Sequence, residues 1–143
     1  MRNSIRLMVC IAVLGVGQQV ALAQNNEYQG TPVSTTVFVT FDNGGVAFRP
    51  SADSAATLAG AKDAALVSIR GRTSTGVPTA KDEALALARA AAARAYLVAR
   101  GVSPLKITLN YASAADFIAD NTTAAGRRQN QRVEIDIVYV PTL

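Results

Sequence analysis

Residues 121–135 read NTTAAGRRQNQRVEI and join two kinds of sequence with different structural demands. The first half is rich in small and polar side chains, which satisfy backbone groups where a chain turns sharply. The second half opens the segment QRVEIDIVYV (131–140), in which apolar and polar side chains alternate. That period of two predicts a strand whose buried face consists of Val133, Ile135, Ile137 and Tyr139. A polar turn is therefore expected to lead directly into a core strand.

Three further strands are predicted upstream, over TTVFVTFD (35–42), AALVSIRG (64–71) and LKITLNY (105–111). The first alternates as the last strand does, and Asn43-Gly44-Gly45 after it is typical of a turn. In the second, Leu66 and Ile69 are the strongest candidates for the core.

Two helices are expected between these strands. Ser51 can cap a short alanine-rich helix over 52–61, and Thr79 can cap a long one that runs to Arg100. Gly101 provides the stop after the long helix. The spacing of apolar residues in the long helix predicts a stripe that faces the sheet. This stripe consists of Leu85, Ala88, Ala92 and Tyr96, and Leu97 lies beside it.

With residues 112–122 as a loop, the predicted order of elements is β-α-β-α-β-β. This order is typical of an α/β fold (an α+β sandwich) in which the helices pack on one face of a mixed sheet.

The N-terminus has the pattern of a secretory signal peptide over residues 1–23. Arg2 and Arg6 precede a short apolar run, and Ala21-Leu22-Ala23 has the small residues of a cleavage site. Residues 24–35 are expected to be a flexible lead-in and residues 36–143 the single folded domain. Cys10 lies inside the apolar run rather than after small residues, which argues against a lipid-modified cysteine.

Composition limits the chemistry of the mature chain. Of 143 residues, removal of 23 leaves 120, with no cysteine or histidine. No metal, no cofactor and no histidine-based triad is therefore expected, and the protein is not expected to be an enzyme. Twelve basic residues against ten acidic ones, without an aromatic platform, give no argument for nucleic-acid binding.

The three sequence blocks IRGRTSTG (69–76), LALARA (85–90) and NTTAAGRRQNQRVEI (121–135) together resemble the C-terminal domain of outer membrane protein A. This OmpA-like family includes peptidoglycan-associated lipoproteins and flagellar motor stators. Its pattern runs Gly-His-Thr-Asp, then Asn-x-x-Leu-Ser-x-x-Arg-Ala, then Asn-x-Thr-x-x-Gly-Arg-x-x-Asn-x-Arg-Val. The resemblance covers about residues 36–140 and rests on these matches: Gly71 and Thr73; Leu85, Arg89 and Ala90; Asn121, Thr123, Gly126, Arg127, Asn130, Arg132 and Val133.

The resemblance implies binding of the diaminopimelate residue in the peptidoglycan stem peptide. In this family the arginine at position 89 pairs with a carboxylate of that residue, which suits its planar fork of donors. The implied ligand-binding residues are Thr73, Ser74, Asp82, Arg89, Asn130 and Arg132. The polar-turn argument favours an architectural role for Asn121, Thr123, Gly126 and Asn130, and the resemblance places Gly126 and Arg127 in a short helix.

Arg72 and Ser74 depart from the family pattern, because they stand where the family has histidine and an aspartate that pairs with the ammonium group. Asp82, at the start of the long helix, is a candidate to compensate. Two functions stay open. The first is a periplasmic or outer-membrane-associated module that binds peptidoglycan and anchors an envelope component. The second is a degenerate OmpA-like scaffold, which binds envelope proteins within a conjugation, secretion or pilus machine.

We expect the exported protein to begin at Gln24, because the cleavage pattern ends at Ala23. N-terminal sequencing of periplasmic material checks this expectation. A start at Met1, or a lipid attached to Cys10, would contradict it.

Overall fold

The computed structural model describes residues 31–111 and 116–141. The expected signal peptide, and the expected lead-in up to residue 30, lie outside the described residues. The first strand begins at Val33, inside the stretch that was expected to be lead-in.

The described residues form four strands, three α-helices and two short 3-10 helices. In chain order they are β1 (Val33–Thr40), α1 (Ala52–Ala59), η1 (Gly60–Asp63), β2 (Leu66–Gly71), α2 (Ala80–Val98), η2 (Pro104–Lys106), β3 (Ile107–Tyr111), α3 (Ala124–Asn130) and β4 (Arg132–Tyr139). The predicted order lacked α3, although the family resemblance had placed a short helix there.

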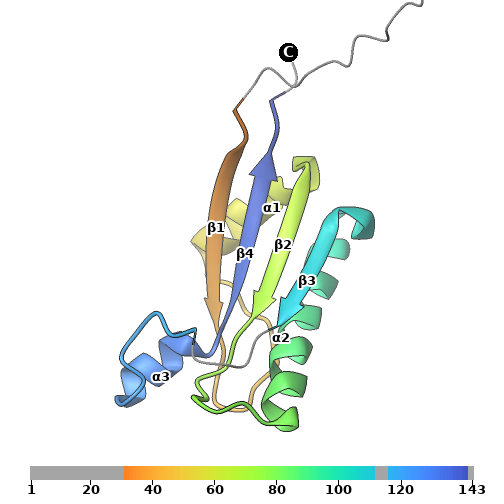
Figure 1. Cartoon of the computed structure of the whole chain (residues 1–143). Coiled ribbons are helices and arrows are strands. Elements are labelled where there is room, and N and C mark those ends of the chain that lie inside the picture. The colour runs from red at the N-terminus through yellow and green to blue at the C-terminus, as the bar shows by residue number, and fades with distance from the viewer. Residues whose placement is uncertain (1–30, 112–115, 142–143) are drawn as a thin grey trace, which may run out of the picture.

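The strands form one mixed sheet in the order β1-β4-β2-β3 (Figure 1). The last strand of the chain lies in the interior of the sheet, antiparallel to both β1 and β2. β3 pairs with β2 in parallel, and α2 supplies the crossover that a parallel pair requires. The predicted mixed α/β fold is confirmed.

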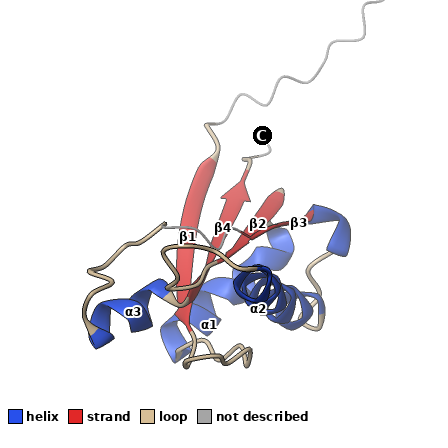
Figure 2. Cartoon of the chain, turned by 60° about the horizontal axis from the view of Figure 1, so that its bottom comes forward, coloured by secondary structure: helices blue, strands red, loops and turns tan. Residues whose placement is uncertain are grey.

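Helices α1 and α2 cover one face of the sheet, as predicted (Figures 1 and 2). α1 packs against β1, and α2 packs against β2, β3 and β4. α3 does not join this layer, because it lies beyond the end of β1 (Figure 1). No described helix covers the opposite side of the sheet, which we call the open face.

The core lies between the sheet and these two helices. Val133, Ile135 and Ile137 of β4 are fully buried, and Tyr139 packs against the same cluster, as the alternation predicted. Ile69 is also buried, but the prediction for Leu66 is wrong, because this side chain is 41% exposed. In a strand with period two, Leu66 must face away from Val67 and Ile69 and therefore lies on the open face.

Helix α2 starts and faces the sheet for identifiable reasons. Thr79 and Asp82 form a capping box, in which each side chain accepts a hydrogen bond from the other residue's backbone. The predicted apolar stripe is right only in part: Tyr96 packs against the core, as expected, but Ala88 is exposed and Leu85 is only half buried. The buried stripe is Ala86, Arg89, Ala90, Ala93 and Leu97. Small side chains face the sheet because the helix lies close to it, and the larger ones flank the contact.

Gly71 makes this close approach possible. A Cβ atom added at position 71 would lie 2.0 Å from the carbonyl oxygen of Ala86 and 3.3 Å from the Cβ of Ala90. The glycine of the first motif block and the alanine of the second are therefore paired across the contact between β2 and α2.

Leu97 is expected to be a main contributor to the stability of α2 on the sheet. Its side chain is fully buried, whereas Leu87 on the same helix is 39% exposed. Leu97→Ala should lower the free energy of unfolding by about 2–5 kcal/mol through lost burial and a residual cavity. Leu87→Ala should cost less than about 1 kcal/mol. Urea unfolding of both variants checks this, and equal losses would show that the helix face is misassigned.

Gly71→Ala should also destabilise the protein, because helix α2 would have to move away from β2. We expect a cost of about 1–3 kcal/mol, as is usual for overpacking. Gly76→Ala is the matched control, since an added Cβ there meets no atom within 4 Å. Thermal melts compare the two variants, and a Gly71→Ala melt like that of wild type would contradict the close contact.

Candidate functional site

The strand ends determine where a site can form. β1 and β2 end, β4 begins and α2 begins at the same end of the sheet, near α3 (Figure 1). The loops that follow β1 and β2 therefore meet the turn between α3 and β4. The end of β2 and the loop after it carry the first motif block, and α3 with the start of β4 carries the third.

Arg89 is hydrogen-bonded through its side chain to the loops after β1 and β2 and to the turn between α3 and β4. Its side chain is fully buried, and its Nε donates to the carbonyl oxygen of Gly45 at 2.9 Å. Its Nη1 donates to the carbonyl of Arg72 at 3.1 Å. Its Nη2 donates to the carbonyl of Asp42 at 3.1 Å and to Oε1 of Gln131 at 3.2 Å. One guanidinium thus holds the loop after β1, the end of β2 and the start of β4.

The charge of Arg89 has no carboxylate partner among the described residues. Its contacts are carbonyl and amide oxygens, and its guanidinium carbon lies 5.1 Å from the centre of the Phe41 ring. Burial lowers the pKa of Arg89 to about 10, so the group stays charged at neutral pH. Four of its five N–H groups are used by these hydrogen bonds, and one on Nη1 is left.

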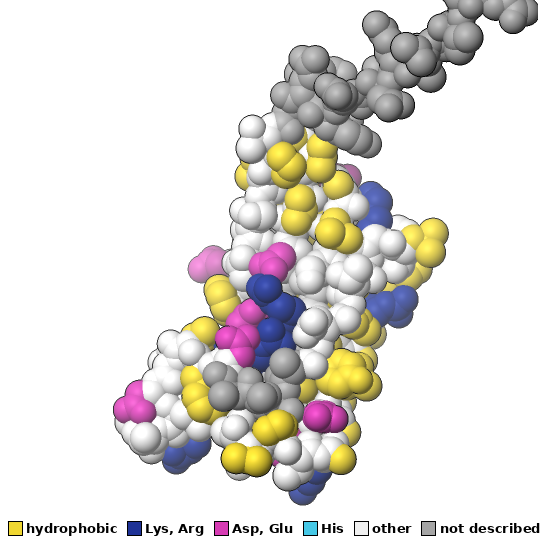
Figure 3. Space-filling view, viewed as in Figure 1, with side chains coloured by type: hydrophobic (Ala, Val, Ile, Leu, Met, Phe, Trp, Pro, Cys, Tyr) yellow, Lys and Arg dark blue, Asp and Glu magenta, His cyan; other side chains and the backbone are white. Residues whose placement is uncertain are grey.

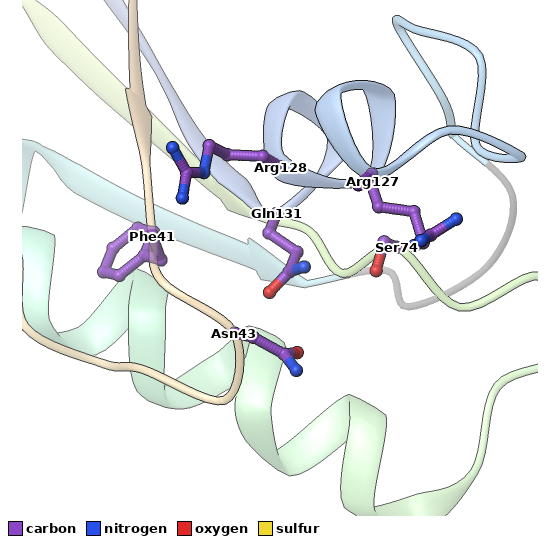
Figure 4. A pocket seen from close by; sticks show the side chains of 7 residues that line it. Phe41, Asn43, Ser74, Arg127, Arg128 and Gln131 are labelled. Carbon is purple, nitrogen blue, oxygen red and sulfur yellow. The ribbon is translucent and has the colours of Figure 1, made fainter.

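Figure 4 shows a cleft of about 470 Å³, two of whose lining residues, Phe41 and Gln131, contact Arg89. It is lined by Phe41, Asn43, Ser74, Ala124, Arg127, Arg128 and Gln131. Two arginines and no carboxylate line it. Because Oε1 of Gln131 accepts from Arg89, the amide nitrogen of Gln131 remains as a donor toward the cleft.

The two arginines of the cleft differ in their freedom. Nη1 of Arg127 donates to the carbonyls of Asn121 and Thr122, at 3.2 and 2.8 Å. Arg128 is exposed and makes no hydrogen bond or ion pair within the part of the chain that the structure describes. Arg128 is therefore the cation that a ligand can recruit without breaking an internal contact.

Ser74 is the one predicted site residue that lines the cleft. Its backbone carbonyl accepts a 2.7 Å hydrogen bond from Nδ2 of Asn121, and Oδ1 of Asn121 accepts from Nδ2 of Asn130. Thr73, next to it, is buried. A chain of two asparagines therefore fixes the position of Ser74.

Asn130 is fully buried and supports the loop before α3. Its Oδ1 accepts from the backbone N–H groups of Ile118 and Ala119, and its Nδ2 donates to the carbonyl of Ala119. Gly126 supports the same loop, since a Cβ there would lie 1.8 Å from the carbonyl oxygen of Asp120. These contacts have the character that an architectural role requires.

Asp82 lies outside the lining of the cleft. Its carboxylate accepts from the backbone and hydroxyl of Thr79 and from the hydroxyl of Thr75, at 3.0, 2.6 and 2.8 Å. These bonds, the Thr79 hydroxyl first, lower the pKa of Asp82. The carboxylate therefore caps α2.

Arg132 lies on the open face of the sheet, whereas its neighbour Gln131 lines the cleft. It is ion-paired to Glu134 and donates to the carbonyl of Asp116 at 3.0 Å. Figure 3 shows basic and acidic side chains gathered in a cluster on this face of the sheet, although Arg132 itself is almost fully buried. The ion pairs of this cluster are Arg70 with Glu134 and Asp136, Arg72 with Asp116, and Arg132 with Glu134. The hydrogen bond from Arg72 lowers the pKa of Asp116.

Apart from Ser74, sequence reasoning assigned none of the cleft lining to the site, and it missed Phe41, Asn43, Ala124, Arg127, Arg128 and Gln131. Gln131 follows the motif asparagine directly, and Asn43 belongs to the predicted turn. The crowding of arginines at 127 and 128 was the available indication.

No helix among residues 31–111 and 116–141 is both long and apolar enough to span a bilayer. The OmpA family pattern matches residues 40–131. A Brucella suis protein, named as a candidate outer membrane lipoprotein of a type IV secretion system, is 31% identical over 87% of this chain and 74% of its own length.

Solved structures share the fold. The peptidoglycan-associated lipoprotein of Burkholderia pseudomallei has a TM-score of 0.60 at 20% identity, over 71% of this chain and 88% of that one. The cell wall anchor of the T6SS of Pseudomonas aeruginosa has a TM-score of 0.58 at 23% identity, over 74% and 82%. Since the family pattern spans more than half of the sequence, the chain belongs to the OmpA family.

Proposed function

We propose that the protein binds the stem peptide of peptidoglycan non-covalently in the cleft beside Arg89 and thereby anchors an envelope component to the cell wall. In this proposal it acts in the periplasm, which fits its likeness to a Brucella protein named as a candidate outer membrane lipoprotein and to a Pseudomonas cell wall anchor. The observation that carries the proposal is the cationic cleft of this OmpA-family domain, lined by Ser74, Arg127, Arg128 and Gln131. The proposed role is binding, without a catalytic step.

The chemistry of the cleft suits a peptide carboxylate. Arg128 offers a guanidinium that makes no hydrogen bond or ion pair to the described residues, and Gln131 offers amide N–H groups. A hydrogen bond between charged partners contributes about 1.5–3 kcal/mol, and a bidentate arginine contact adds geometric selectivity. The buried charge of Arg89 also makes the electrostatic potential in the cleft more positive, because the protein interior has a low polarisability and screens the charge weakly.

A scaffold role within a secretion machine is the second candidate. The observation that favours it is the likeness to the Brucella protein, whose name places it in a type IV secretion system. Ser74 also favours it, since the family aspartate at this position is absent. In that role the domain would retain the fold and bind an envelope protein instead of the wall.

Co-sedimentation with purified sacculi tests the proposal. Arg128→Ala should weaken binding about tenfold, which corresponds to the loss of one charged hydrogen bond. Arg100→Ala is the control, because Arg100 is an exposed arginine at the other end of α2, stacked on Tyr96.

If wild type binds sacculi and only Arg128→Ala loses affinity, the cleft is the binding site. A wild-type protein that remains in the supernatant would contradict peptidoglycan binding. The scaffold role would then be tested by crosslinking in whole cells.

A further inference from the structure

We propose that the cleft recognises a carboxylate whose neighbouring amine is acylated, in preference to the zwitterion with a free ammonium group. This inference rests on the proposed function and specifies the form of its ligand. It assigns to Ser74 the role of a specificity-determining residue. The ligand form that fits is a stem peptide whose side-chain amine is already joined to another strand as an amide.

The first argument is the charge of the cleft. Its lining contains Arg127 and Arg128, and the positive charge of Arg89 lies buried beneath Gln131. Three cations at one site attract a carboxylate and repel an ammonium group.

The second argument is that the lining of the cleft contains no acidic side chain to offset these cations. Asp82 caps α2, Asp116 pairs with Arg72, and Asp120 accepts the backbone N–H and hydroxyl of Thr122. Asp42 is exposed, and it does not line the cleft. A bound ammonium group would therefore be desolvated without a counter-charge, which is costly in a partly enclosed site.

The third argument is the nature of Ser74. A hydroxyl can donate one hydrogen bond and accept two, so it can pair with either the N–H or the C=O of an amide. Its position is fixed through its carbonyl by Asn121. Acylation of the ligand amine removes one positive charge and leaves a neutral group that this hydroxyl can contact. The same change would leave an aspartate at position 74 without its ion-pair partner.

Isothermal titration calorimetry with two synthetic stem peptides tests the inference. Both peptides end in diaminopimelate, one with the free side-chain amine and the other with that amine acetylated. Wild type should bind the acetylated peptide at least about fivefold more tightly, and Ser74→Asp should reverse this preference. Ser74→Ala should weaken both but keep the order, because it changes no charge.

A second variant keeps the test independent of whether Ser74→Asp folds, which a thermal melt establishes first. Arg128→Gln removes one of the three cations at an exposed side chain and should reduce the preference for the acetylated peptide. An unchanged preference in Arg128→Gln would contradict the electrostatic argument.

The possible results separate the two claims. Tighter binding of the free amine, or equal binding, would overturn the inference and leave peptidoglycan binding intact. Binding of sacculi but of neither peptide would also overturn it, since the protein would then recognise a part of peptidoglycan other than the diaminopimelate residue. If neither peptide nor sacculi bind, the proposed function fails and the inference fails with it.

Discussion

The structure of the sheet end that carries the cleft depends on the hydrogen bonds made by the buried guanidinium of Arg89. Arg89 sits on the buried stripe of α2 and donates to carbonyls of two separate loops and to the side chain at the start of β4. Burying a cation is unfavourable unless its donors are satisfied, so the loops must adopt conformations that aim their oxygens at it. The same residue therefore shapes the cleft and gives it a positive floor.

The remaining polar motif residues extend this support outward. Asn130 holds the loop before α3, Asn121 connects it to Ser74, and Gly126 allows the backbone to approach Asp120. On the open face, Arg132 and Arg72 bind Asp116 from β4 and from the end of β2. The residues of the third block thus mainly fix the loop before α3 against β2 and β4, and this arrangement also forms one side of the cleft.

The sequence predicted the fold well wherever the apolar period was clear, as in β4, and wherever a cap marked a helix start, as at Thr79. The prediction of the buried face of α2 failed in part, because large apolar side chains were expected to face the sheet. Leu85 and Ala88 were wrongly expected to face the sheet, because the closest contact consists of alanines packed near Gly71, while Tyr96 does pack against the core. The seven residues of α3 contain no apolar repeat, and only the family resemblance indicated a helix there. The partners of Arg89 are largely backbone carbonyls, which no side-chain pattern reveals, and Gln131 was hidden at the edge of a predicted strand.

The direction of β1 has a mechanical consequence. The chain enters β1 at Val33, at the end of the sheet opposite to the cleft. The eight residues of β1 span about 26 Å from this point to the end of the sheet near the cleft. A pull between the incoming chain and a molecule held in the cleft would therefore act parallel to β1 and to its partner β4. The hydrogen bonds from Val33↔Tyr139 to Thr40↔Arg132 would then bear the load together, in shear, rather than open one after another. The domain is consequently oriented to transmit tension along its strands, from one end to the other.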